Sequence, residues 1–248
     1  MVKFPDKIIG DGALLLTVTR FLLLCFIIPR QSRIVLPDIP HHVTQRGNYQ
    51  QNIFEKQADY QQHCLWVQES AVKYEITILA FCLMSNHVHF IVVPHREDSL
   101  AKTFNTSHMC YSQYMNRKHK VRGHLWQGRF FSCFMDDDHL YRAIRYVEQN
   151  PVRVRMVKDA WEYQWSSAVV HAGMAKDEEP LPINRAGFAM SASEWRKYLR
   201  AEDREMCSEM RLKTGRGLAI GSERFINRIE HNLQRSLQCL PQGRPKKQ

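Results

Sequence analysis

A short apolar run at residues 84–93 constrains the fold more than any other part of this 248-residue chain. Its sequence, MSNHVHFIVV, is rich in β-branched and aromatic residues, which predicts a buried strand. Because side chains alternate across a strand, His87 and His89 share one face and Val88 points to the other. Two imidazoles side by side on a rigid element form a natural pair of metal ligands. The alternative is a pair of solvated histidines on an open sheet face.

The segments around this run follow a β-α-β-β-α-β order. Apolar periodicity predicts strands and helices in turn, the strands at 41–46, 76–84, 87–93 and 131–135 and the helices at 56–74 and 99–120. This is the order of a split β-α-β unit, so we predict an α+β, ferredoxin-like antiparallel sheet with helices on one face. A third helix begins at the acidic residues 136–138 and is predicted to stop at Asn150-Pro151, because proline cannot continue the hydrogen-bond ladder.

Composition divides the chain into three regions. They are an apolar N-terminal extension at 1–32, the predicted α+β domain at 33–173, and a linker with a basic, helical C-terminal extension at 174–248. The apolar extension has three interpretations: a non-native upstream segment, a packing or association helix, and a membrane anchor. The anchor is the least favoured, because the apolar stretch is slightly short of about 20 residues and contains Arg20.

The charge of the chain indicates the class of its partner. Lysine and arginine number 35 against 25 aspartates and glutamates, a formal net charge of +10. This excess favours a polyanion, nucleic acid first and an anionic membrane surface second. The seven cysteines are scattered and include no Cys-x-x-Cys pair, so they indicate neither a zinc ribbon nor a disulfide framework. Reduced thiols in a cytosolic protein are the simplest account.

A motif on the predicted third helix carries the chemistry. Tyr146 and Asn150 are four residues apart, so they lie on one helical face. If this face meets His87 and His89, two imidazoles and an amide oxygen would hold a divalent ion with open positions. Such an ion polarises a phosphodiester, and a nearby tyrosine can attack the phosphorus and keep the DNA end as a phosphotyrosine. Glu148 is predicted to face away from this site.

Four ordered motifs between residues 33 and 173 resemble a single family. They are PHHVTQRGN at 40–48, MSNHVH at 84–89, LWQGRF at 125–130 and RYVEQNPVR at 145–153. Together they resemble the REP-associated tyrosine transposases of the single-tyrosine HUH superfamily. The resemblance implies an HUH nuclease fold, a Mg²⁺ or Mn²⁺ cofactor, metal ligands and a nucleophile. The implied ligands are His87, His89 and Asn150, and the implied nucleophile is Tyr146.

The same resemblance implies a substrate and a place of action. The family cuts and rejoins single-stranded hairpin DNA at repetitive palindromic elements, through a 5′-phosphotyrosine and a free 3′-hydroxyl. A cytoplasmic, nucleoid-associated protein is therefore expected, with membrane contact disfavoured. Some family members are homodimers that exchange the tyrosine helix, so a homodimer is an open alternative to a monomer.

Three other tyrosines compete with Tyr146 for the role of nucleophile. Tyr111 and Tyr114 lie on the preceding helix beside basic residues, which suits contact with the DNA backbone better than attack. Tyr141 lies on the same helix as Tyr146 but has Arg145 in place of an amide four residues later. Tyr146 is the favoured nucleophile.

Basic and aromatic residues supply the predicted DNA surface. Trp126 is predicted to stack on unpaired bases, whereas Phe130 and Phe131 suit stacking and packing on the sheet equally well. Phosphate contacts are predicted for Arg46, Arg117, Lys118, Lys120, Arg122 and Arg129. For Arg46 an exposed turn arginine is equally favoured. The basic tail at 243–247 is either a minor-groove hook or inert.

Two further functions stay open on the sequence. One is a domesticated protein that binds palindromic repeats without cutting them. The other is a metal-binding or RNA-binding module on the same fold. The intact set of His87, His89, Tyr146 and Asn150 favours the nuclease over both.

Overall fold

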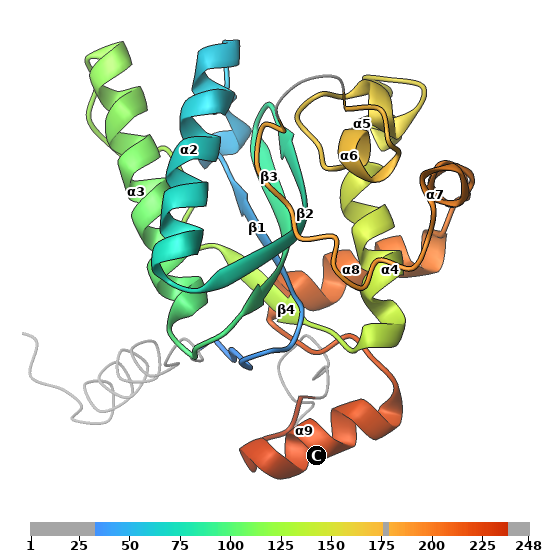
Figure 1. The fold of residues 1–248 in the computed structure, drawn as a ribbon. Coiled ribbons are helices and arrows are strands. Elements are labelled where there is room, and N and C mark those ends of the chain that lie inside the picture. The colour runs from blue at the N-terminus through green and yellow to red at the C-terminus, as the bar shows by residue number, and fades with distance from the viewer. Residues whose placement is uncertain (1–32, 176–178, 238–248) are drawn as a thin grey trace, which may run out of the picture. The chain divides into compact units, whose positions relative to one another are not determined.

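A computed structural model of the chain describes residues 33–175 and 179–237 (Figure 1). Every described helix and strand lies between His41 and Leu233. The apolar N-terminal extension and the basic tail at 243–247 lie outside the described residues, so their interpretations stay predictions. Across the described ranges, no helix is both long and apolar enough to span a membrane.

Four antiparallel strands form one sheet in the order β2-β3-β1-β4. The strands are β1 (His41–Arg46), β2 (Ile76–Met84), β3 (His87–Pro94) and β4 (Phe131–Phe134). This is the strand order of a split β-α-β sheet, so the predicted α+β, ferredoxin-like fold is confirmed. The hairpin between β2 and β3 turns at Ser85-Asn86, one residue before His87.

The helices of the described ranges follow the strands in the predicted order. They are α2 (Gln57–Lys73), α3 (Ser99–His119), α4 (Asp137–Glu148), α5 (Asn150–Arg153), α6 (Ala168–His171), α7 (Ala192–Leu199), α8 (Arg204–Arg216) and α9 (Glu223–Leu233), with short 3₁₀ turns η1 (Asn48–Gln50) and η2 (Ala160–Glu162). The two helices of the split unit, α2 and α3, lie together on one face of the sheet as predicted, and α4 and α8 pack on the strands from the other face (Figure 1).

The alternation along β3 explains why both faces are covered. Phe90 points toward α3 and contacts Phe104, with ring centroids 5.3 Å apart. Its neighbour His89 points the other way and contacts Tyr146 of α4, with centroids 5.9 Å apart. Because successive side chains of a strand alternate, one apolar run serves both the core and the predicted site.

The predicted third helix, α4, ends at Glu148, directly before the predicted stop at Asn150-Pro151. A single residue separates the end of α4 from the start of α5 at Asn150, and Pro151 lies in the first turn of α5. Gln149 is the C-cap of α4, so the predicted end of this helix is confirmed, and the short α5 can begin at Asn150 because a proline in a first turn has no helical partner to lose. The helical path past Tyr146 therefore continues to Arg153.

The C-terminal extension packs against α4. The predicted helical extension contains α7 and α8 as separate helices, because the carboxylate of Asp203 caps the first turn of α8 and starts a new helix there. Arg142 and Arg145 of α4 pair with Asp203, with N–O distances of 2.8 and 2.5 Å. The Ser222 hydroxyl caps α9 by accepting from the backbone N–H of Phe225.

Glu148 points away from the site, as predicted. Its fully buried carboxylate accepts hydrogen bonds from the Ser167 hydroxyl and from Trp195 Nε1, and lies 2.6 Å from Nδ1 of His171. His171 lies in α6, Trp195 lies in α7, and Ser167 directly precedes α6. Through these contacts, Glu148 holds α6 and α7 against α4.

Candidate active site

Strands β1 and β3 bring three histidines together. In the strand register Thr44 lies opposite His89, and Arg46 lies opposite His87. Because cross-strand partners share a face, His42 and Arg46 lie on the same side of the sheet as His87 and His89. The rings of His42 and His89 stack with centroids 5.1 Å apart, and the rings of His87 and His89 meet edge-on at 4.9 Å.

Hydrogen bonds orient these imidazoles. Oδ1 of Asn86 accepts from Nδ1 of His87 at 2.6 Å, which leaves the lone pair of His87 on Nε2. A chain of bonds runs from the Thr214 hydroxyl to Nδ1 of His42, and from Nε2 of His42 to Nδ1 of His89, each 2.8 Å long. When His89 donates to His42 and His42 donates to Thr214, His89 also has its lone pair on Nε2.

Burial keeps the three histidines neutral. Burial lowers the pKa of His42 to about 3 and that of His87 to about 4. It also lowers the pKa of His89 well below its usual value, with further lowering by the neighbouring histidines and by Arg153. At neutral pH each ring therefore has one nitrogen without a proton, and on His87 and His89 this nitrogen is Nε2, whose lone pair can bind a metal ion.

Helix α4 brings Tyr146 onto the same histidines. The Tyr146 ring lies edge-on to His42 and His89, with centroid distances of 5.8 and 5.9 Å. Burial raises the pKa of the hydroxyl, whereas the guanidinium groups of Arg153 and Arg211 act to lower it. Arg211 does so partly through a hydrogen bond to the Tyr146 side chain. The site thus combines neutral imidazoles, a tyrosine and two cations.

Helix α5 adds an amide and a guanidinium beside Tyr146. The amide nitrogen of Asn150 donates to the backbone carbonyls of Tyr146 and Val147, at 3.3 and 2.9 Å, which leaves its amide oxygen for another ligand. The guanidinium carbon of Arg153 lies 4.4 Å from the centroid of the Tyr146 ring, and its Nη2 donates to the Tyr146 carbonyl.

Sequence reasoning assigned no role to four residues of this site, namely His42, Arg153, Arg211 and Thr214. A signal existed for the first two. His42 lies four residues before Arg46 on a predicted strand, so the two side chains share one face. Arg153 follows Tyr146 by seven residues, about two helical turns. No local pattern marks Arg211 or Thr214, because α8 reaches the site only through the fold.

The three rival tyrosines have their hydroxyl groups engaged elsewhere. The hydroxyl groups of Tyr111, Tyr114 and Tyr141 donate to the Ile53 carbonyl, the Asp59 carboxylate and the Gly187 carbonyl, respectively. Of the four candidates, Tyr146 is the one whose ring contacts His89. The geometry supports Tyr146 as the nucleophile.

The predicted aromatic contacts divide into one exposed and two buried rings. Phe131 is half exposed and lies opposite Thr44, on the histidine face of the sheet. Trp126 is buried, and its Nε1 donates to the carbonyl of His108 at 3.0 Å. Phe130 is buried against Phe104. Phe131 therefore fits base stacking, whereas Trp126 and Phe130 are packing residues in this structure.

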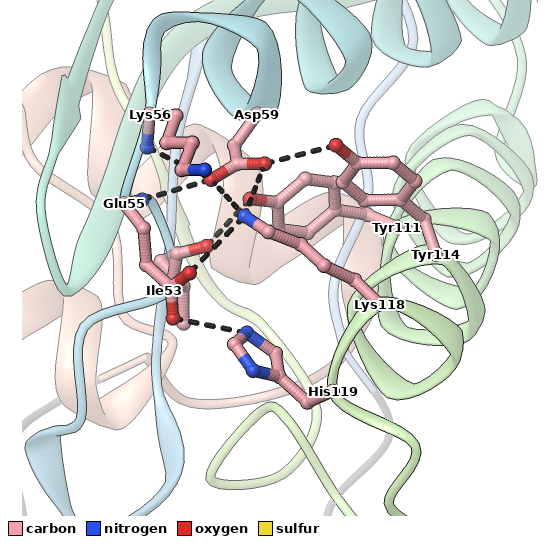
Figure 2. Close-up of polar contacts among 8 residues, drawn as sticks. All are labelled: Ile53, Glu55, Lys56, Asp59, Tyr111, Tyr114, Lys118 and His119. Carbon is pink, nitrogen blue, oxygen red and sulfur yellow. Dashed lines mark hydrogen bonds and ion pairs between the residues drawn. The ribbon is translucent and has the colours of Figure 1, made fainter.

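Lys118 is held in an ion-pair network and does not lie free for DNA (Figure 2). Its Nζ lies 2.7 Å from Oδ2 of Asp59 and 3.1 Å from Oε2 of Glu55. The Asp59 carboxylate is 1% exposed and also accepts from the Tyr114 hydroxyl and from two backbone N–H groups. These contacts hold the last turn of α3 to the start of α2. Lys118 therefore has a structural role in place of the predicted phosphate contact.

Replacing Lys118 by methionine is expected to destabilise the fold by about 3 kcal/mol, because it leaves the buried Asp59 carboxylate without its cation. Urea unfolding at neutral pH measures the loss. Arg117→Met is the matched control, since Arg117 is exposed and pairs with no carboxylate among the described residues, and it should change stability by less than about 0.5 kcal/mol. Equal effects of the two substitutions would contradict the structural role of Lys118.

A cation at this site would need ligands of several types. Within the described ranges, no three His, Cys, Asp or Glu side chains converge on one metal position. His87 and His89 can supply two nitrogen ligands through Nε2. The amide oxygen of Asn150, four residues after Tyr146, is the predicted third ligand.

Comparison with known proteins adds a family to this geometry. Residues 36–150 match the family model described as "Transposase IS200 like", a segment that contains all four strands and α4. Two solved structures are similar at low identity. One is a REP-associated tyrosine transposase bound to a REP hairpin, with 16% identity, a TM-score of 0.48, and 66% of this chain and 97% of that chain covered. The other is a putative transposase from Deinococcus radiodurans, with 15% identity, a TM-score of 0.33, and 49% and 97% covered. No curated protein matches the chain.

Proposed function

We propose that the chain is a metal-dependent endonuclease and strand transferase of single-stranded, hairpin-forming DNA. The first reason is that residues 36–150 belong to the IS200-like transposase family. Membership of the family supports a DNA-cleaving role in general terms. The observation that carries the finer proposal is the edge-on contact of Tyr146 with His89, at a centroid distance of 5.9 Å. It joins the predicted nucleophile to the predicted metal ligands.

His87, His89 and the amide oxygen of Asn150 are the proposed ligands of Mg²⁺ or Mn²⁺. Both histidines are neutral and oriented, His87 by Asn86 and His89 by His42, which supports this role. When bound, the cation withdraws negative charge from the scissile phosphate and stabilises the leaving oxygen.

The Tyr146 oxygen is proposed to attack the phosphorus of the scissile phosphodiester. A new phosphorus–oxygen bond forms to the tyrosine, and the bond to the 3′ oxygen of the upstream strand breaks. The hydroxyl loses its proton, and the leaving oxygen gains one to become a 3′-hydroxyl. Arg211 and Arg153 favour the deprotonated tyrosine and so limit the rise in the pKa of Tyr146 that burial causes. Attack of a 3′-hydroxyl on the phosphotyrosine restores a phosphodiester and frees Tyr146.

Exposed cations near the histidines supply the proposed DNA surface. The backbone N–H of Gln127 donates to the Arg46 carbonyl, and that of Asn48 donates to the Leu125 carbonyl, at 2.9 and 2.8 Å. The loop before β4 is therefore joined to the end of β1, beside His87. The exposed basic side chains of this end are Arg46, Arg117, Lys120, Arg122 and Arg129. They suit salt-sensitive contacts with the phosphate backbone.

Incubation with labelled single-stranded hairpins tests the proposal. The oligonucleotides would carry palindromic repeats of the genome that encodes the chain, with single-stranded flanks. We expect a protein–DNA adduct that survives denaturant in Mg²⁺ or Mn²⁺, with the label of the downstream fragment only. Chelation of the metal by EDTA should lower adduct formation by about 100-fold or more, because the charge on the phosphate is no longer offset.

Matched nucleic acids separate the proposal from its rivals. The same sequence as a full duplex or as RNA should give no adduct. Tight binding of the hairpin without an adduct, in either metal, would favour the non-catalytic repeat binder. Preference for RNA would favour an RNA-binding module.

A further inference from the structure

A cavity beside Tyr146 has no role in the chemistry above. It has a volume of about 600 Å³ and lies between residues 149–161 and residues 199–211. Pockets of about 300–1,000 Å³ hold organic ligands in other proteins, so a nucleotide unit fits this volume. We name it the arginine cleft after its basic lining residues, Arg153, Arg155, Lys158, Arg200, Arg204 and Arg211.

The acidic side chains of the arginine cleft are neutralised by other partners. Asp159 pairs with Arg200, and Glu202 pairs with Arg204, each at 3.0 Å. Asp203 pairs with two arginines of α4 that do not line the cleft. Within the described residues, no carboxylate pairs with the other four cations, which are Arg153, Arg155, Lys158 and Arg211. The cleft therefore has an excess of positive charge that suits an anion.

Two of these cations connect the cleft to the nucleophile. Arg211 hydrogen-bonds to the Tyr146 side chain, and Arg153 stacks on the Tyr146 ring at 4.4 Å. Nη1 of Arg153 is buried and has no hydrogen-bond partner among the described residues. A buried donor without a partner is unfavourable, and an anion within reach would relieve it. The cleft therefore adjoins the oxygen that is proposed to attack phosphorus.

The cleft also contains an aromatic surface. Trp161 of η2 lines it, and the guanidinium carbon of Arg200 lies 5.1 Å from the indole centroid. Indole rings stack on DNA bases with little regard to sequence, and grooves for single strands combine such rings with cations. The lining thus suits a phosphate and a base together.

We propose that the arginine cleft binds the single-stranded nucleotides next to the scissile phosphate. Arg155 and Lys158 contact their phosphates, and Trp161 lies beside a base. This inference rests on the proposed function and deepens it, since it assigns part of the substrate to residues beyond the matched segment 36–150. Arg155 and Lys158 are exposed, so charge reversal there should leave the fold intact.

Binding of hairpin oligonucleotides with and without a single-stranded flank of about ten nucleotides tests the cleft. All variants carry Tyr146→Phe, so that binding is measured without turnover. Arg155→Glu with Lys158→Glu should weaken binding of the flanked hairpin by about 10-fold or more, and leave the blunt hairpin within about 2-fold. The slope of log affinity against log salt for the flanked hairpin should become shallower by about 1.4, since two phosphate contacts are lost.

The matched control reverses two exposed charges outside the cleft, Lys73→Glu with Arg224→Glu, on α2 and α9. It should leave the advantage of the flanked hairpin unchanged. An equal loss in both double variants would overturn the inference, because the effect would come from net charge alone. Saturation of the cleft by thymidine monophosphate, with no gain from a flank, would overturn it in favour of a free nucleotide.

The two proposals fail in different ways. If the native chain forms the covalent adduct but the cleft variants lose no flank binding, the cleft inference is wrong and the nuclease stands. If flank binding depends on Arg155 and Lys158 but no adduct forms, the cleft stands and the nuclease assignment is wrong.

Discussion

Tyr146→Phe should lower the rate of DNA cleavage by about 10⁴-fold or more, since the enzyme then lacks its nucleophile. The substitution keeps the ring that contacts His42 and His89 and on which Arg153 stacks. It removes the oxygen to which Arg211 bonds. Single-turnover cleavage and the denaturant-resistant adduct measure the loss, and affinity for the hairpin should stay within about 3-fold, because the exposed cations are unchanged.

Tyr141→Phe is the matched control for this prediction. Tyr141 lies on the same helix, and its hydroxyl donates to the Gly187 carbonyl and accepts from the backbone N–H of Ala189. Loss of the Tyr141 hydroxyl should leave the rate of cleavage within about 3-fold of the native rate and lower the free energy of unfolding by about 1 kcal/mol. Adduct formation by Tyr146→Phe would refute the assignment, and loss of the adduct in Tyr141→Phe would move the nucleophile one turn along α4.

Strand periodicity accounts for most of what the sequence predicts here. A period of two placed His87 and His89 on one face of β3, and the order of strands and helices predicted the sheet. The four-residue spacing placed Asn150 one turn from Tyr146, and the hydrogen bond between them agrees with that spacing. Such features depend on local backbone geometry, which is why they can be predicted without the fold.

The errors come from long-range partners that the local sequence does not show. Lys118 lies in a charge run that is typical of a solvated surface, yet its partner Asp59 is 59 residues away. Trp126 suits base stacking by type, but its indole N–H is taken by the His108 carbonyl inside the core.

The C-terminal extension contacts the site through residues that no local sequence pattern identified. Thr214 of α8 ends the hydrogen-bond chain through His42 to His89, and Arg211 of the same helix bonds to Tyr146. The family match ends at Asn150, before α8 begins. A part of the chain that the motifs left as an appendage therefore completes the orientation of the proposed metal ligands and nucleophile.

Three histidines outside the site are expected to make the fold sensitive to mild acid. Burial lowers the pKa of His63 to about 3 and of His41 to about 4, and lowers that of His108 well below its usual value. In the unfolded chain these rings take up protons below a pKa of about 6.5, whereas in the folded chain they stay neutral. Proton uptake thus favours the unfolded state as the pH falls below 6.5, until the folded pKa values are reached.

Between pH 7.5 and pH 5.5 each such histidine lowers the free energy of unfolding by about 1.4 kcal/mol, so the three together lower it by about 4 kcal/mol. This is a large part of the stability of about 5–15 kcal/mol that is typical of a domain. Urea unfolding across this pH range measures the effect. His63→Leu isolates one contribution, because both ring nitrogens of His63 are buried and lack hydrogen-bond partners in the part of the chain that the structure describes.

The leucine variant is expected to be at least as stable as the native chain at pH 7.5, since an apolar side chain replaces unsatisfied polar atoms. Its loss of stability on acidification to pH 5.5 should be smaller than that of the native chain by about 1.4 kcal/mol. Asp136 and Asp203 have lowered pKa values and lose their stabilising contributions only at lower pH, so they do not mimic this change. A stability that is flat between pH 7.5 and 5.5, or an unchanged loss in the variant, would show that these histidines are protonated in the folded state. The aromatic cluster of His63, in which Phe54 and Tyr111 meet its ring edge-on, would then have to admit a charge and its hydration.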